Sequence, residues 1–103
     1  MILATTNYIT GKNLEILGVV KGNMILSRHL GTDIGQGFKQ MVGGELKKFT
    51  EMMNQSREDA TNRMIKEAER MGADAIISMR YASSSVTQDA AEVIAYGTAV
   101  KFI

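Results

Sequence analysis

The sequence contains no cysteine, no proline and no tryptophan, and it has a single histidine. Without cysteine there are no disulfides and none of the thiolate ligands that soft metals prefer. Without proline, long helices and strands can run uninterrupted. No charge of one sign dominates, because 12 basic residues balance 11 acidic ones to a net charge of +1. We therefore expect neither nucleic acid nor a membrane as a partner.

Long apolar runs are also missing from the sequence. No stretch approaches the roughly 18 apolar residues of a transmembrane helix. The first residues do not join a basic region to a long apolar one, so we expect no signal peptide and a cytoplasmic protein. A length of 103 residues, of which 45% are hydrophobic, is typical of a single domain over residues 1–103.

An amphipathic helix is predicted over residues 44–71, where apolar residues recur at steps of three, four or seven. Glu45 in the first turn and Gly72 just beyond the last apolar residue are typical of helix ends. At about 1.5 Å per residue the helix would be about 40 Å long, more than one globule of this size needs. We therefore expect part of its stripe to pack on another subunit. The stripe consists of Leu46, Phe49, Met53, Ala60, Met64, Ala68 and Met71.

Three strands are predicted around this helix, over residues 15–26, 73–81 and 92–103. The first contains Gly18 and Gly22, which indicate a bulge or the close approach of another backbone. The third is apolar on both faces, which is typical of a central strand.

Alternation along the second strand places Ile77, Met79 and Tyr81 on one face, and Ser78 and Arg80 on the other. The serine-rich stretch that follows, residues 83–89, is predicted to be the connection to the third strand. Residues 2–6 are a further candidate for a short strand.

These elements predict an α+β domain with two layers and the order β-α-β-β. A β-α-β crossover makes the first two strands parallel. The third strand should then lie between them and run antiparallel to both, which gives a three-stranded sheet in the order 1-3-2. One helix cannot cover both faces of this sheet, so we expect the uncovered face to meet a copy of the same chain.

Residues 27–43 are rich in glycine and show no clear periodicity, and a connection of this length is often functional. The alternative is a short helix that serves oligomer contacts. His29 alone does not make a metal site, because such sites need three or four ligands. A site would form if symmetry brought several copies of His29, or the carboxylates of Asp33 or Glu45, to one axis. The alternative is a surface or interface histidine.

Polar residues on the predicted strands offer a second candidate site. Arg80 could pair with Glu92 across neighbouring strands or across an interface. Tyr96 could contribute aromatic area to the packing or contact a ligand. Together with Arg28 and Glu45, these two residues are the candidate ligand-binding residues, whereas His29 and Asp33 are the candidate metal ligands.

Two blocks of the sequence resemble the YbjQ family of small prokaryotic proteins, which are described as heavy-metal-binding or uncharacterised. The first block is GGELKKFTEMMNQSREDATNRMIKEAERMGADAIISMRY and the second is AAEVIAYGTAV. The likeness extends over essentially the whole chain. The resemblance implies a dodecin-subunit-like β-α-β-β fold in a homo-pentameric ring, without an established enzyme activity.

Two functional hypotheses follow. The first is a non-enzymatic homo-oligomer that binds a metal ion or a small molecule between its subunits. The second is an enzyme with an active site at the interface, in which the histidine acts as acid or base. The first is favoured, because the sequence shows no set of acid–base partners. The second would use Arg28, His29, Glu45, Arg80 and Tyr96.

Overall fold

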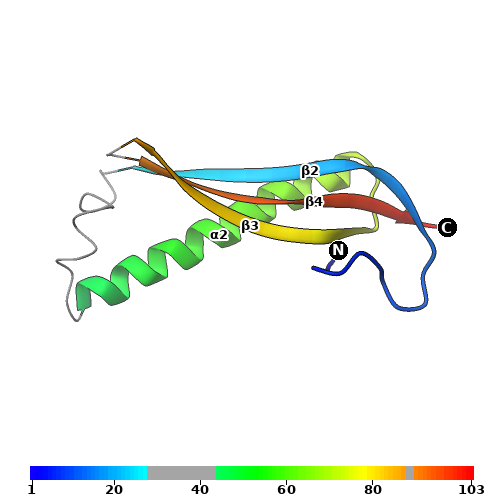
Figure 1. Ribbon diagram of the computed structural model, residues 1–103, viewed down its shortest axis with the longest axis horizontal. Helices are drawn as coiled ribbons and strands as arrows, with labels where there is room; N and C mark the ends of the chain where they lie inside the picture. The colour runs from blue at the N-terminus through cyan, green and yellow to red at the C-terminus, as the bar shows by residue number, and fades with distance from the viewer. Residues whose placement is uncertain (28–43, 88–89) are drawn as a thin grey trace.

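The computed structural model describes residues 1–27, 44–87 and 90–103. Within these residues one helix, α2 (Gly44–Arg70), lies against one face of a sheet (Figure 1). The sheet has four strands in the order β1-β3-β4-β2. Their bounds are β1 (Ile2–Leu3), β2 (Leu14–Ser27), β3 (Ala75–Thr87) and β4 (Ala90–Phe102).

The structure has the α+β class expected from the sequence, but the sheet has four strands where the main prediction had three, and the fourth falls within residues 2–6, the further candidate strand. β1 pairs in parallel with the first residues of β3, and this adds a fourth strand at the edge. β4 lies between β3 and β2 and runs antiparallel to both. β1 has only two residues, so its apolar pattern is too short to show pairing in the sequence.

The predicted helix over 44–71 is confirmed as α2. Gly72 ends it in the left-handed conformation, with φ of 76°. The N–H of Gly72 donates to the carbonyl of Glu69 at 3.0 Å, and the N–H of Ala73 donates to the carbonyl of Ala68 at 3.1 Å. This is the hydrogen-bond pattern of a Schellman cap. No helix in the described part of the chain has the length and apolar character needed to cross a membrane.

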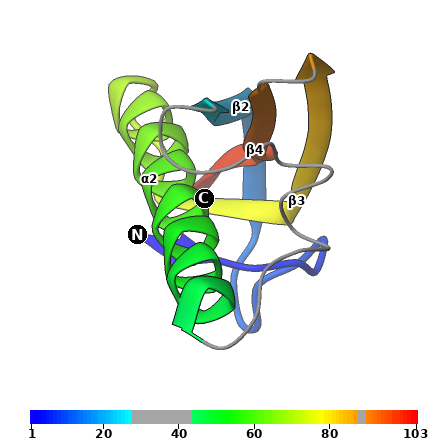
Figure 2. The same ribbon diagram turned by 90° about the vertical axis from the view of Figure 1, so that its left-hand side faces the viewer.

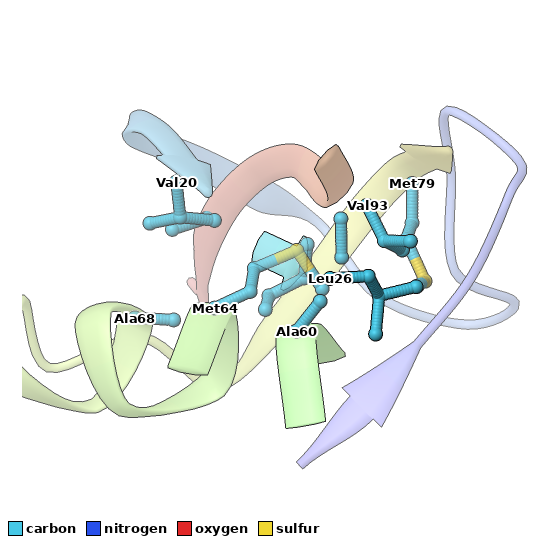
Figure 3. Packing of buried hydrophobic residues seen from close by; sticks show 10 residues of the cluster. Val20, Leu26, Ala60, Met64, Ala68, Met79 and Val93 are labelled. Carbon is cyan, nitrogen blue, oxygen red and sulfur yellow. The ribbon is translucent and has the colours of Figure 1, made fainter. Parts of the chain in front are cut away.

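Only the second half of α2 builds the core. Ala60, Met64 and Ala68 are fully buried and point toward the sheet, where they meet Val20 and Val93 (Figure 3). Over residues 44–55, by contrast, no described side chain is fully buried. In the first half of the predicted apolar stripe, Met53 is partly buried against this core, whereas Leu46 is 38% exposed.

Glycine lets the helix approach β2 closely. A Cβ on Gly22 would overlap with the backbone oxygen of Ala60 and the backbone nitrogen of Met64. Gly18 follows a register shift after Ile16 and has φ of 152°. Both predicted roles of glycine in this strand, close backbone approach and a bulge, are therefore confirmed.

β3 is longer than predicted, because it continues to Thr87. Ser83, Ser84 and Ser85 pair with residues of β4, so the interpretation of these serines as a connection is wrong. Their side chains are exposed, and an exposed serine run carries no apolar alternation that would indicate a strand. Residues 88–89 lie outside the described residues.

Among the described residues, the face of the sheet turned away from α2 is covered only at one end. There Ile9, Leu14 and Phe102 pack on a small buried cluster. Beyond it, Val19 is 78% exposed and Ile25 is 49% exposed. We call this surface the open face, and its members follow from strand pairing, because direct partners share a face. It comprises Ile16, Val19, Lys21, Asn23, Ile25, Arg80, Ala82, Ser84, Glu92, Ile94, Tyr96 and Thr98.

Replacing Gly22 by alanine should destabilise the fold strongly. The added methyl group meets helix backbone, which cannot rotate away, so we expect a loss of about 3 kcal/mol in the free energy of unfolding. Urea denaturation at fixed protein concentration measures this change. The control is Gly44→Ala, where a Cβ meets nothing within 4 Å and stability should stay equal or rise by up to about 1 kcal/mol. Equal stability of the two variants would contradict the packing described here.

Candidate functional site

A bulge in β3 decides which side chains reach the open face. Ile77 pairs with Thr98, and the next pair joins Arg80 to Tyr96, so three steps along β3 match two along β4. The additional residue reverses the alternation of side chains. Met79 therefore turns toward α2, where it is buried, and Arg80 turns to the open face.

The predicted alternation along this strand is wrong for the same reason. Ile77 belongs to the cluster on the open-face side, whereas Met79 belongs to the core under α2. The hydroxyl of Tyr81 lies 2.7 Å from the hydroxyl of Thr61, so Tyr81 also faces the helix. Arg80 consequently lies on the same face of the sheet as Ile77, although the predicted alternation placed these two residues on opposite faces.

The bulge is held by the N-terminal segment. Ser78 has φ of 52°, a left-handed conformation that is uncommon for residues other than glycine. Its N–H donates to the carbonyl of Thr6 at 2.8 Å, and the N–H of Met79 donates to the carbonyl of Ala4 at 3.0 Å. Across the sheet, a Cβ on Gly97 would lie 2.7 Å from a side-chain carbon of β3. Glycine at this position therefore leaves the room that the bulge requires.

The guanidinium of Arg80 is anchored at one of its nitrogens. Nη1 donates to the carbonyl of Thr5 at 2.9 Å and to the carbonyl of Met79 at 2.8 Å, which uses both of its hydrogens. Within the described residues, Nε and Nη2 make no hydrogen bond. These two groups form the edge of a guanidinium that binds a carboxylate or phosphate with two parallel hydrogen bonds.

Strand register aligns three polar side chains across the open face. Tyr96 of β4 pairs directly with Arg80 of β3 on one side and with Lys21 of β2 on the other. We call these three residues the cross-strand row. The outer two Cα atoms are about 10 Å apart, since neighbouring strands lie about 4.8 Å apart. The side chain of Lys21 is long enough to reach over Tyr96, which is 41% exposed, whereas Arg80 is held at its own anchor.

The cations of the cross-strand row have no acidic partner among residues 1–27, 44–87 and 90–103. The acidic side chain on this face is Glu92, and its Oε2 accepts a hydrogen bond of 3.2 Å from Nδ2 of Asn23. The predicted pairing of Arg80 with Glu92 within the chain is wrong, since Ser84 lies opposite Glu92. The continuation of β3 to Thr87 brings the two strands into this register.

The structure thus brings together Arg80 and Tyr96 from the predicted set of ligand-binding residues, and it adds Lys21, which the sequence did not single out. Only the register of β2 against β4 reveals Lys21, and that register depends on the bulge at Gly18. Glu45 lies in the first turn of α2, and the role of its side chain stays a prediction. The predicted residues Arg28, His29 and Asp33 lie outside the described residues.

Comparisons with known proteins agree with this fold. Residues 1–103 match the YbjQ family model, whose description is "Putative heavy-metal-binding". The chain is 55% identical to a UPF0145 protein of Clostridium novyi and 58% identical to one of Alkaliphilus metalliredigens, and each match covers 100% of both chains. It therefore belongs to the YbjQ family, as its sequence predicted.

A solved structure shows the same fold at low sequence identity. This crystal structure, of a protein with unknown function from Pediococcus pentosaceus, matches with a TM-score of 0.71 and 20% identity. The match covers 100% of this chain and 98% of that chain. At this identity the similarity is evidence of fold alone.

The donor groups of the described residues do not fit the heavy-metal description of the family. In the described part of the chain, no group of three or more histidine, aspartate or glutamate side chains could hold an ion. The sequence has no cysteine, and its one histidine is His29. Soft metals prefer thiolate and imidazole ligands, so the described residues offer no such site.

Replacing Arg80 by methionine should loosen the bulge. The variant loses both Nη1 hydrogen bonds, of which the one to the carbonyl of Thr5 holds the N-terminal segment, so the amides of Ser78 and Met79 should exchange about tenfold faster. Hydrogen–deuterium exchange measures this. Lys21→Met is the matched control, because it removes a cation of the same row without touching that segment. Unchanged exchange in Arg80→Met would contradict the anchoring role.

Proposed function

We propose that this protein works as a homo-oligomer that binds a small molecule or a metal ion between its subunits, with five copies in a ring as the family resemblance implies. The observation that carries the proposal is the open face. Ile16, Val19 and Ile25 on it are 71%, 78% and 49% exposed. They share this face with Ile94 and Tyr96 of the central strand. Large apolar side chains exposed together on one face mark an interaction site.

The shape of the single chain supports association. Its radius of gyration is 16.3 Å and its extents are 51 × 23 × 16 Å. A compact domain of this length has a radius of gyration of about 13 Å. In Figure 2, α2 lies on one side of the sheet, and no helix of the described residues lies on the other side. Association would supply the missing layer.

The edges of the sheet favour a copy of this chain as the partner. Among the described residues, no strand pairs with the outer edge of β2, and β1 pairs only with the first residues of β3. Unpaired edges bind further strands readily. β2 and β3 run in the same direction, because each is antiparallel to β4. Head-to-tail pairing of β2 with β3 of the next copy would repeat and could close into a ring.

The cross-strand row supports the small-molecule part of this proposal, because it lies in the middle of the open face. Binding of a metal ion depends on His29 and Asp33, which lie outside the described residues, and it stays a prediction. No observation favours the enzyme hypothesis specifically. Of its five residues, Arg80 and Tyr96 are the two whose side chains the structure describes, and they are direct strand partners.

Replacing Val19 by aspartate should disrupt assembly. If the open face is covered, the variant buries a charge without a partner, and the dissociation constant for assembly should rise by at least about 100-fold. Native mass spectrometry should show five times the 11.3 kDa mass for the wild type and 11.3 kDa for the variant.

Asn62→Asp is the matched control for this experiment. It adds the same charge at an exposed position of α2, on the other side of the sheet, and should leave the mass unchanged. A wild-type protein that stays monomeric at micromolar concentration would refute the proposal. Full assembly of Val19→Asp would refute the open face as the contact surface.

A further inference from the structure

We infer that Lys21, Tyr96 and Arg80 form a binding site for the phosphate or carboxylate group of a small molecule. The inference rests in part on the proposed function, because it names the chemical class of the ligand that the open face would hold. It departs from the family description, because the charge of the row suits an anion and repels a metal cation.

Arg80 is prepared for such a ligand before the ligand arrives. Two backbone carbonyls, those of Thr5 and Met79, fix the guanidinium through Nη1. The Nε and Nη2 edge is then held in one orientation, with its two hydrogens available for a bidentate acceptor. A donor that is fixed in advance loses less conformational entropy on binding, and this favours affinity.

The bulge in β3 is energetically unfavourable by itself, and a binding role of the cross-strand row accounts for its presence. A regular strand would turn Arg80 toward α2 and Met79 toward the open face. The bulge reverses this, at the expense of a left-handed Ser78 and the restriction of position 97 to glycine. Bulges often aim a side chain at a functional site. Strained backbone is likewise concentrated at such sites.

Charge on the described open face indicates the sign of the ligand. Lys21 and Arg80 are its two cations, and Glu92, its acidic residue, is hydrogen-bonded to Asn23. Covering two cations without a counter-charge is unfavourable, because an unpaired charge loses its hydration. An anion in the row would offset this penalty, so ligand binding and assembly should stabilise each other.

The neighbours of the row indicate what the anionic group is attached to. In the strand register Tyr96 lies between Lys21 and Arg80, and the row is flanked by Val19 and Thr98 on one side and by Ile94 on the other. An aromatic ring beside apolar side chains offers a surface for an apolar or planar body. A small molecule with one anionic group and one aromatic ring fits both features.

Isothermal titration calorimetry at low ionic strength tests this with phenyl phosphate, benzoate and inorganic phosphate as probes. Wild-type protein should bind phenyl phosphate or benzoate saturably, and more tightly than inorganic phosphate. Lys21→Met and Arg80→Lys should each weaken binding by about tenfold, because each loses charge-assisted hydrogen bonds to the ligand. Tyr96→Phe should weaken it less, because the ring remains. The control Lys66→Met removes an exposed cation from α2 and should change nothing.

Failure of all three probes to bind would overturn the inference, as would equal binding by the control and row variants. Assembly is recorded on every sample by native mass spectrometry, so that the two proposals fail separately. An oligomer that binds no probe refutes only the anion site. A monomer that binds phenyl phosphate through the row refutes only the assembly. If Lys21→Met and Arg80→Lys dissociate the oligomer and no probe binds, a carboxylate of a neighbouring copy occupies the row, and the small-molecule inference is wrong.

Discussion

The contact between the backbone of α2 and Gly22 of β2 is the constraint on which this structure depends. No side chain separates helix and strand at this point, so the helix lies low over the sheet, and Ala60 and Met64 reach the core directly. Small residues on the helix and glycine on the strand make this short separation between helix and strand possible. Because the helix is fixed here, all of its buried residues lie on one face of the sheet. In the described part of the chain, the opposite face is covered only at the end where Ile9 and Phe102 pack.

The open face combines two features that an isolated chain would not need. Exposed apolar residues on neighbouring strands favour contact with another protein surface, and two cations beside a tyrosine favour an anion. The two features are compatible, because two cations covered together with an anion cost less than two cations covered alone. The bulge at Ser78 connects them, since it places Arg80 among these residues and buries Met79 on the other side. Local strain in β3 therefore serves the same surface that assembly would cover.

Much of this fold could be predicted from periodicity and glycine. The helix followed from steps of three and four, its end from Gly72, and the close packing on β2 from Gly22. The second strand was mispredicted, because a bulge changes the period within the strand and a serine run lacks apolar alternation. For the site, Arg80 and Tyr96 could be proposed from residue type. Lys21 could not, because its place depends on register between strands far apart in sequence, and residue type alone does not encode register.

Solvent access to the open face tests the central claim most directly, and the absence of cysteine makes the measurement clean. Single-cysteine variants Val19→Cys and Asn62→Cys each carry one thiol, on the open face and on the outer side of α2. The rate of reaction with a neutral thiol reagent, at a concentration where the wild type is assembled, reports whether each position is covered. We predict that Val19→Cys reacts at least about tenfold more slowly than Asn62→Cys, and that the two rates become equal in denaturant. Equal rates in the native protein would contradict the account, because the face opposite the helix would then be open to solvent.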